Sequence, residues 1–373
     1  MKFKLNAKRL KQALQIVEAV IPARTALPAA THVRLSIKNE RLTLTTTNIH
    51  TVIQYTFGVI GATDGVAVVP AKKLLDFIKT LSDEELEADL NPNNRHLKLN
   101  VGSILLEMPT LDDAEFPMSK QEAGPTFVIK QSELREAIRL TAFAAEQNTD
   151  RYILNGCYLA FTPTGTCQVL ATDSRRLALY SFNPDQLPDQ LDKLKLLIPS
   201  AVASILQNQL IHQSSIKITL GGSQVSMCFD TVEQDNYYLQ FSQIEGTYPD
   251  CRGFLPKTLE HNSINRLALL LALKRAISIA DADGKVQLKF HGTKLEVEAR
   301  ASSTSVANNC FLVERIPMEY KGPMVTIAFT AKLLAQALDE IDEELISFNI
   351  DGDTKPLILH TPNYLYMNMP LRS

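Results

Sequence analysis

The chain has 373 residues, of which 45% are hydrophobic and 21% charged, and its formal net charge at pH 7 is −3. This composition is typical of folded globular proteins and excludes a disordered or fibrous chain. A chain of this length is expected to form two or three domains. Because the net charge is negative, any binding of a polyanion would need a local basic surface.

The sequence also bears on where the protein works. The longest apolar run, residues 267–273, is much shorter than the roughly 20 residues that a membrane-spanning helix needs. Near the N-terminus, lysine and arginine alternate with single apolar residues, which is unlike the apolar core of a signal peptide. We therefore expect a cytoplasmic protein.

The first predicted helix follows Asn6, a favourable N-cap, and its apolar residues over 10–17 recur at helical spacing. The same pattern returns 124 residues later, where a helix follows Ser132. A third, less regular version runs from Ile264 to Ile277. The chain thus contains three similar helix starts.

A second predicted helix belongs to each of these segments. These helices span residues 72–81, 201–210 and 332–341, and the first two are preceded by Pro70 and Pro199. Proline is well tolerated where a helix begins, because its missing N–H is not needed there. Thr330 takes the place of proline before the third helix, at offsets of 129 and 131 residues along the series.

Alternating apolar residues predict antiparallel strands around these helices. The stretch Ala171–Tyr180 combines strand-forming residues with the polar turn Asp173-Ser174, so we predict a hairpin there. Residues 44–49 and 295–300 occupy similar places in the flanking thirds of the chain. We therefore predict three repeats, at residues 1–122, 123–255 and 256–373.

Repeats longer than 100 residues are whole domains rather than the short units of a solenoid. Each repeat should contain two helices and several antiparallel strands. The predicted fold class is therefore α+β, with helices covering one face of the sheets in each of three similar domains arranged in an arc.

A catalytic or metal-binding centre is not indicated. The five cysteines and seven histidines are scattered without the spacing of a zinc site or a disulfide framework. Phosphate-binding glycine loops and nucleophile motifs are also missing. Asp281-Ala-Asp-Gly284 resembles the start of a calcium loop but lacks its closing glutamate, and Asp112-Asp113 is better explained as a surface loop. We predict no cofactor, no metal and no enzymatic activity.

Basic residues on the predicted first helices are candidates for contacts with phosphates. A charged helix face is more often only a solvated face, and that alternative stays open at this point. Arg135 and Arg139 are four residues apart and should project from one side of their helix, as phosphate contacts would require. The candidates are Lys8, Lys11, Arg135, Arg139, Lys274 and Arg275.

Several segments together resemble the bacterial sliding clamp family, the β subunit of DNA polymerase III. The resemblance extends over the whole chain, and its most specific segments are residues 150–156, 171–177, 248–250 and 369–372. It implies a head-to-tail homodimer that forms a closed ring of six similar domains with helices lining a central hole. The function it implies is that of a non-catalytic processivity factor that encircles double-stranded DNA without sequence preference.

The resemblance also implies site residues and partners. Arg24 and Tyr152 match DNA-contacting positions of the family, whereas Asn148 and Ile153 differ from the residues usual there. The implied partners are the replicative DNA polymerase, the clamp loader and other proteins with a clamp-binding peptide. The implied peptide pocket is lined by Leu154, Thr172, Ser174, Arg175, Leu177, Pro249, Phe254, Pro356, Met367, Met369 and Leu371.

The dimer contact implied by the resemblance joins the strand around residues 104–108 to the third domain near Ile277 and residues 300–310. Leu106, Met108 and Ile277 are its apolar candidates. Two other functions are considered beside the clamp: a monomeric repeat scaffold that binds peptides without enclosing DNA, and an unrecognised hydrolase. The mass of the protein in solution would separate the first from the clamp, and substitution of its acidic and histidine residues would test the second.

Overall fold

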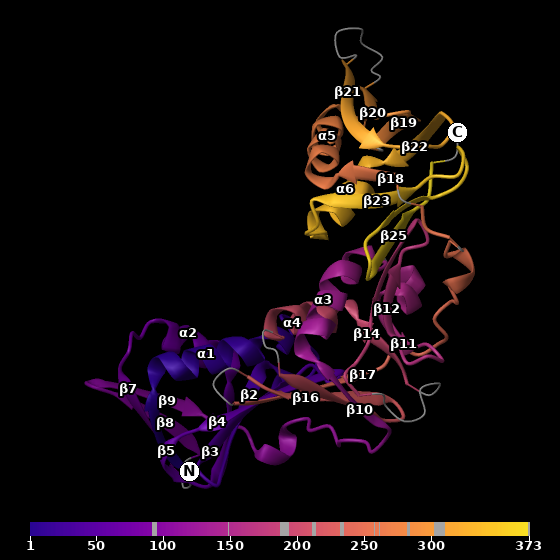
Figure 1. The fold of residues 1–373 in the computed structure, drawn as a ribbon. Helices are drawn as coiled ribbons and strands as arrows, with labels where there is room; N and C mark the ends of the chain where they lie inside the picture. Colours follow the sequence, from indigo (N-terminus) through magenta and orange to yellow (C-terminus); the bar gives the residue numbers. More distant parts are fainter. Residues whose placement is uncertain are drawn as a thin grey trace. The chain divides into compact units, whose positions relative to one another are not determined.

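The computed structural model has two compact units (Figure 1). Unit 1 contains residues 1–134, 185–190 and 204–243, and unit 2 contains residues 135–184, 191–203 and 244–373. The structure describes residues 1–91, 95–147, 149–186, 194–210, 214–231, 235–256, 258–260, 262–281, 284–301 and 310–371.

Unit 1 contains a five-stranded antiparallel sheet in the order β5-β1-β7-β8-β9. Alternation along these strands buries one face, as in β1, where Phe3 and Leu5 are buried between exposed residues. The strands are β1 (Lys2–Asn6), β5 (Ile60–Thr63), β7 (Glu85–Asn91), β8 (His96–Val101) and β9 (Ile104–Pro109).

A second sheet of unit 1 has eight strands in the order β10-β15-β16-β17-β4-β3-β2-β6. It joins strands from residues 32–70 to strands from residues 126–242, because β17 pairs with β4. The strands are β2 (His32–Lys38), β3 (Arg41–Thr47), β4 (Thr51–Gly58), β6 (Gly65–Pro70), β10 (Thr126–Lys130), β15 (Ser215–Leu220), β16 (Gln224–Asp230) and β17 (Asn236–Ser242).

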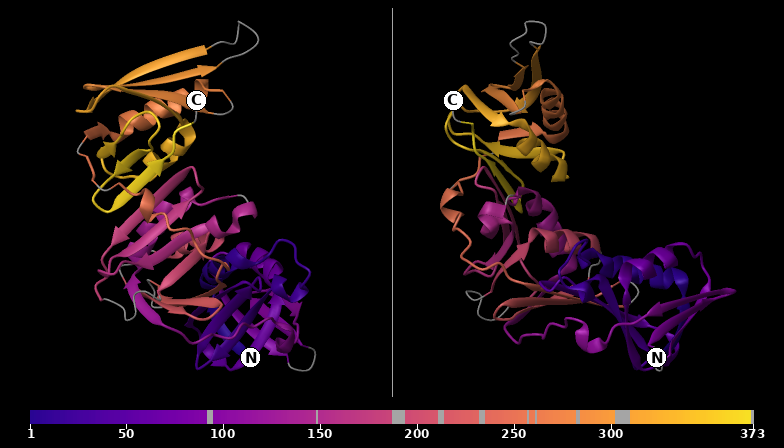
Figure 2. Two further views of the ribbon diagram at one scale, coloured as in Figure 1. Left: turned by 90° about the vertical axis from the view of Figure 1, so that its right-hand side faces the viewer. Right: turned by 180° about the vertical axis from the view of Figure 1, so that it is seen from behind.

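Two helices of unit 1, α1 (Ala7–Val17) and α2 (Ala71–Lys79), lie side by side on one face of its strands (Figures 1 and 2). The Asn6 side chain caps α1 by accepting a hydrogen bond from the Lys8 amide at 2.8 Å. Apolar residues at helical spacing, including Leu10 and Leu14, are buried against the sheets. The N-terminal helix and its cap are therefore as predicted.

Unit 2 contains a twelve-stranded sheet in the order β14-β11-β12-β13-β25-β24-β23-β18-β21-β20-β19-β22. Its central junction is the antiparallel pairing of β13 with β25, the last strand of the chain. The strands are β11 (Gly156–Phe161), β12 (Cys167–Thr172), β13 (Arg176–Phe182), β14 (Lys195–Pro199), β18 (Asn262–Asn265), β19 (Lys285–His291), β20 (Lys294–Ala301), β21 (Cys310–Glu319), β22 (Val325–Thr330), β23 (Leu345–Asn349), β24 (Leu357–His360) and β25 (Tyr364–Asn368).

The remaining α-helices are α3 (Gln131–Thr141), α4 (Ser200–Gln209), α5 (Arg266–Ile279) and α6 (Ala331–Glu340). In unit 2, α5 and α6 pack against each other beside the strands that precede them (Figure 1). Unlike α1, the helix α5 is apolar on several sides, and Leu267 and Leu271 remain exposed on it.

The same succession of elements occurs three times along the chain. A strand leads into a helix in β1-α1, β10-α3 and β18-α5, and again in β6-α2, β14-α4 and β22-α6. The predicted α+β fold of three similar repeats is thereby confirmed, with the second helices each beginning one residue earlier than predicted. The boundaries at 122 and 255 stay a prediction, because shared strands make the compact units cross them.

A buried ion pair connects α1 of unit 1 to the residue before β17. The Arg9 guanidinium pairs with Asp235, whose side chain is only 6% exposed, and the Tyr55 hydroxyl donates to the same carboxylate. Arg9 also lies over the Phe57 ring, 5.2 Å from its centroid. Burial and the hydrogen bond to Asp235 raise the pKa of Tyr55 to about 12. This cluster fastens residues of the first predicted repeat to the second.

Replacement of Asp235 with alanine should strongly destabilise the protein. The change removes the buried counter-charge of Arg9 and the acceptor for Tyr55, and losses from such broken pairs are about 3 kcal/mol or more in the free energy of unfolding. Urea unfolding followed by circular dichroism measures the difference.

The matched control is Asp89→Ala, which removes the partner of Lys2 in an ion pair whose side chains are 57% and 38% exposed. That exposed pair should contribute at most about 1 kcal/mol. Equal losses of unfolding free energy in the two variants would show that the buried cluster stabilises the protein no more than an exposed ion pair does.

Candidate functional site

The polar turn between β12 and β13 is closed by its own side chains. The Thr172 hydroxyl accepts a hydrogen bond from the Ser174 amide at 3.1 Å. The Asp173 carboxylate accepts two more, from the amides of Arg175 (2.9 Å) and Arg176 (3.0 Å). Ser174 has a φ of +72°, which residues other than glycine seldom adopt. The predicted hairpin is present, and its turn holds Ser174 and Arg175 in solvent.

An apolar cluster lies beside this turn, where β13 meets β25. Register places Leu177 opposite Met367, and Leu154 packs into the same cluster. Sequence reasoning missed several members, although the alternation of apolar residues along β12 and β13 carried a signal for two of them. The buried cluster consists of Leu154, Leu170, Leu177, Leu179, Leu197, Tyr248, Cys251, Ile358 and Met367.

Other residues of the predicted pocket stay accessible. Phe254 is 69% exposed and Met369 is 44% exposed, so both can offer apolar surface to a ligand. The Met369 amide donates to the Arg175 carbonyl at 2.8 Å, which extends the β13·β25 ladder to the turn. Pro249 is exposed, whereas Pro356 and Leu371 are half-buried. We call this apolar cluster, together with the accessible residues predicted to border it, the slot; its predicted lining is the eleven residues named above.

A buried arginine supports the slot turn, a role that was not predicted from the sequence. Arg176 is 7% exposed, and its guanidinium donates to Asp173 (3.0 Å), to Gln336 of α6 (2.5 Å) and to the Phe143 carbonyl (2.6 Å). It also lies 5.3 Å from the centroid of the Phe143 ring. Buried charges need such complete pairing. Arg176 therefore connects the slot turn to two helical elements.

The predicted DNA contact Tyr152 and the two residues that depart from the family pattern, Asn148 and Ile153, lie in different environments. Tyr152 is 59% exposed on the 3₁₀ segment Thr149–Leu154. Ile153 is half-buried and packs against the slot cluster. Asn148 lies outside the described residues. Exposure thus favours Tyr152 as a surface contact.

Among the predicted helix cations of unit 2, three are neutralised by nearby carboxylates. Arg139 donates to Glu136 (2.9 and 2.6 Å) and to Asp342 (2.9 Å), and these interactions raise its pKa. Lys274 pairs with Asp339 at 2.7 Å, and Arg275 hydrogen-bonds Glu314 at 2.7 Å. Arg135 is exposed on α3.

The predicted cations of unit 1 differ. Within the described part of the chain, Lys8, Lys11 and Arg24 form no ion pair with an acidic side chain, and Lys8 and Arg24 are exposed. Because no local carboxylate neutralises them, their charges remain available to a polyanion. Their role as DNA contacts stays a prediction.

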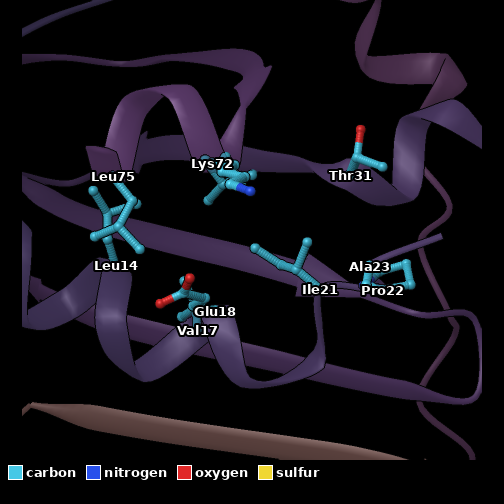
Figure 3. Close-up of a pocket in the computed structure, with 11 residues that line it drawn as sticks. Leu14, Val17, Glu18, Ile21, Pro22, Ala23, Thr31, Lys72 and Leu75 are labelled. Atoms are coloured by element: carbon cyan, nitrogen blue, oxygen red, sulfur yellow. The ribbon is translucent and has the colours of Figure 1, made fainter. Parts of the chain in front are cut away.

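A cavity of about 350 Å³ lies between α1, α2 and the loop that leads to Arg24 (Figure 3). Leu14, Leu75 and Ile21 supply apolar walls, and the charged groups of Glu18 and Lys72 border it. Because Ile21 to Ala23 line this cavity, the loop that carries Arg24 is not backed by a fully packed core. Lys72 adds another exposed cation beside that loop.

Three consecutive segments of the chain match the domains of one protein family. The N-terminal, central and C-terminal domains of the DNA polymerase III beta subunit match residues 1–120, 128–250 and 253–371. The chain belongs to the DNA polymerase III beta subunit family. The predicted resemblance to bacterial sliding clamps is confirmed, and with it the function of a DNA sliding clamp.

Individual members of the family are similar over their full length. The beta sliding clamps of Pseudomonas aeruginosa and Synechococcus elongatus are each 27% identical to the chain, with complete coverage of both sequences. The solved structure of the Pseudomonas aeruginosa sliding clamp bound to griselimycin is 26% identical, covers both chains completely and has a TM-score of 0.90.

Among the described residues, two of the strand edges carry exposed apolar side chains and have no neighbouring strand. β9 is the last strand of its sheet, and Ile104 (46%) and Leu105 (56%) are exposed on it. Of the predicted interface residues, Leu106 is half-buried, whereas Met108 is 3% exposed and packs in the chain's own core. Ile277 on α5 is 37% exposed.

The second open edge is on β21 in unit 2. Over residues 310–317 it pairs with β20 on one side, while β18 pairs only with its end at Met318 and Glu319. Phe311 (58%) and Val313 (37%) are exposed along it. Most of the predicted contact strand, residues 302–309, lies outside the described residues.

The described residues contain no group of three or more histidine, cysteine, aspartate or glutamate side chains placed to hold a metal ion. None of the described helices is long and apolar enough to cross a membrane.

Proposed function

We propose that two copies of this chain close head to tail into a ring around duplex DNA, each contributing three domains at residues 1–122, 123–255 and 256–373. The ring is a non-catalytic, cytoplasmic processivity factor. It holds the replicative polymerase, the clamp loader and other partners through peptides that occupy the slot.

The strand order of the repeats is the observation that carries the proposal. The last strands of the three repeats are β9, β17 and β25, and the inner hairpins that receive strands end in β4, β13 and β21. In unit 1, β17 pairs with β4, and in unit 2, β25 pairs with β13. By the same rule β9 should pair with β21 of a second copy. Both strands have an open edge with exposed apolar side chains among the described residues, and open edges favour such pairing.

A head-to-tail contact of this kind uses two different surfaces of the chain. It therefore continues into a filament unless its rotation closes a ring. Two copies with three similar domains each would close a ring of six. The contact would include Leu106 and Ile277, together with Ile104, Leu105, Phe311 and Val313, whereas Met108 would support β9 from inside.

A ring also reconciles DNA binding with the net charge of −3. The cations Lys8, Lys11 and Arg24, which no acidic side chain neutralises among the described residues, would face the duplex, with Tyr152 as a further contact. Contacts of this type bind phosphates and carry no sequence information, so the ring can slide. Enclosure, rather than charge, would keep it on DNA. Arg135, Arg139, Lys274 and Arg275 would be weaker contacts where carboxylates neutralise them.

The slot suits peptides with large apolar anchors. Each buried anchor gains roughly 1.5–3 kcal/mol before ordering costs, so binding would be exchangeable. The flexible Met367 and Met369 can adapt to different anchors. Binding of griselimycin by the Pseudomonas aeruginosa clamp supports a site of this kind. A monomeric scaffold would use the slot alone and would leave both open edges unexplained.

Charged substitutions at the open edges should give monomers. In the double variant Leu106→Glu and Ile277→Glu, closing the ring would bury two like charges in an apolar contact. Sedimentation velocity at low concentration should show a dimer for the parent chain and half its mass for the variant. Ile60→Glu is the control, because Ile60 is 77% exposed at the opposite edge of the same sheet as β9. A dimeric double variant would contradict the proposed interface.

Retention on DNA should depend on the topology of the DNA. Protein loaded onto closed circular duplex should stay through a high-salt wash, because salt screens phosphate contacts but cannot open a ring. Cutting the circle once should release it within the same wash. Gel filtration of the DNA with labelled protein measures both fractions. Equal loss from circular and cut DNA would rule out enclosure.

Met369→Lys should weaken binding to the slot about tenfold or more, because it replaces one apolar anchor contact by a charge. Titration with fluorescently labelled griselimycin measures the dissociation constant. Met324→Lys makes the same change at a residue that is 70% exposed outside the slot, and its affinity should not change. The dimer mass should persist in both variants. Unchanged affinity in Met369→Lys would remove Met369 from the binding surface.

A further inference from the structure

One short segment of unit 2 serves two surfaces at once. The 3₁₀ segment Thr149–Leu154 carries Tyr152, which is 59% exposed, and Leu154, which is 6% exposed in the slot cluster. These side chains are two residues apart. Any displacement of the exposed part is therefore passed to the slot within one turn of backbone.

Arg151 makes this segment change direction and also reaches the slot turn. Its backbone (φ −121°, ψ 55°) interrupts the helical dihedral angles of the segment. Its guanidinium Nη1 donates to the Ser174 hydroxyl at 2.8 Å. Among the described residues this is the hydrogen bond made by the Arg151 side chain. The residue beside Tyr152 thus holds the exposed border of the slot.

The base of the segment is fixed more firmly than its tip. The Asn155 side chain donates to the Glu146 carbonyl at 2.7 Å, and the Glu146 amide donates to the Leu154 carbonyl at 3.1 Å. The Ser200 amide donates to the Asn155 carbonyl at 3.2 Å. Movement at the tip would therefore pivot about Leu154.

The slot turn is held by its own side chains and by the contact with Arg151. Ser174 has a φ of +72°, a conformation that is unfavourable for a serine and persists when surrounding contacts maintain it. Asp173 and Arg176 hold the turn from beneath, and Arg151 holds it from the side. Loss of the Arg151 contact would release one of these constraints.

We propose that Arg151 is a positioning residue that couples duplex DNA to the partner slot. The inference rests on the proposed function, in which Tyr152 contacts the duplex and the slot binds partner peptides. A phosphate beside Tyr152 would offer Arg151 a charged acceptor, which binds a guanidinium more strongly than a hydroxyl does. Arg151 then leaves Ser174, and the slot border loses order. Bound duplex therefore weakens peptide binding, and by linkage bound peptide weakens the grip on the duplex.

The coupling can be measured as the ratio of the griselimycin dissociation constant with duplex to that without duplex. The dimer is titrated with labelled griselimycin alone and again with a saturating short linear duplex with open ends, which threads through the ring unaided. The affinity of the parent chain should fall about two- to tenfold with duplex, the effect of one ordinary hydrogen bond. In Arg151→Ala and in Ser174→Ala the ratio should be one, because each removes one side of the contact.

Lys294→Ala is the matched control. Lys294 is an exposed cation of unit 2 on β20, outside the slot and the predicted DNA contacts. This variant should keep the ratio of the parent chain. A general effect of lost positive charge would lower the ratio in Lys294→Ala as well as in Arg151→Ala, whereas a specific contact changes it only in Arg151→Ala and Ser174→Ala.

The other results each overturn the inference. A ratio of one in the parent chain means that no coupling exists, and a ratio that persists in Arg151→Ala or Ser174→Ala means that another residue transmits it. Tighter binding with duplex reverses the proposed competition. A parent chain that binds duplex and griselimycin independently leaves the proposed function intact, while failure to bind one of them refutes the function and this inference with it.

Discussion

Antiparallel pairing between distant strands is the constraint on which the rest of the structure depends. In unit 2 the last strand of the chain, β25, completes its sheet only by pairing with β13, and in unit 1 β17 does so with β4. An unpaired strand presents a row of unsatisfied N–H and C=O groups. Each repeat therefore ends with a strand whose free N–H and C=O groups need a neighbouring strand as partner. The chain satisfies this need twice, and β9 remains as the strand whose neighbour a second chain would supply.

The slot lies where it does because of this pairing. Strand β25 brings Met367 opposite Leu177, and the ladder ends at the contact between Met369 and Arg175. On the other face of the strand, the Tyr366 hydroxyl donates to the Leu333 carbonyl of α6 at 2.8 Å. Alternation along one strand thus gives apolar side chains to the slot and polar anchors to the helix behind it. The slot is consequently a property of the junction between strands rather than of a single loop.

Local patterns were sufficient to predict the repeats but not the contacts between distant residues. The Asn6 cap, the proline-led helices and the Asp173-Ser174 turn follow from nearest neighbours in the sequence, and their boundaries were correct to within about a residue or two. The partners of Arg176 and Arg9 lie far away in sequence. The spacing of apolar residues carries no information about these ion pairs and hydrogen bonds. The position of an arginine in the sequence does not show which acceptor groups lie next to it in the fold.

The same limit explains why the helix cations could not be ranked from the sequence. In the sequence, Lys8 and Arg139 are both basic residues on the predicted first helix of a repeat. Glu136, three residues before Arg139, pairs with it and could be read from the sequence, whereas the contact with Asp342, which is 203 residues away, could not. Burial at Met108 is likewise decided by which face of β9 meets the core, and a register of one residue exchanges the two faces. Met108 was predicted from its family position and the two cations from their place on helices, and the roles of all three remain predictions.

A comparison of equivalent turns in the repeats also shows which side chains allow the slot to accept an apolar peptide anchor. The turn before β4 matches the slot turn closely: the Thr47 hydroxyl accepts from the Ile49 amide (2.9 Å), and the Asn48 side chain accepts from the Thr51 amide (2.7 Å). Ile49 even shares the positive φ of Ser174, at +80°. The backbone of a second slot is therefore present in unit 1.

Polar side chains block the equivalent position in unit 1. Register places Gln240 opposite Val52, where unit 2 has Met367 opposite Leu177. The Gln240 amide donates to the Ser119 hydroxyl at 3.0 Å and to the Lys120 carbonyl at 3.1 Å, and its oxygen accepts from Tyr238 at 2.9 Å. An apolar peptide anchor would have to break these buried hydrogen bonds without replacing them, which is unfavourable. One chain thus carries two copies of the backbone frame and a single apolar slot, because a glutamine occupies one copy and a methionine the other.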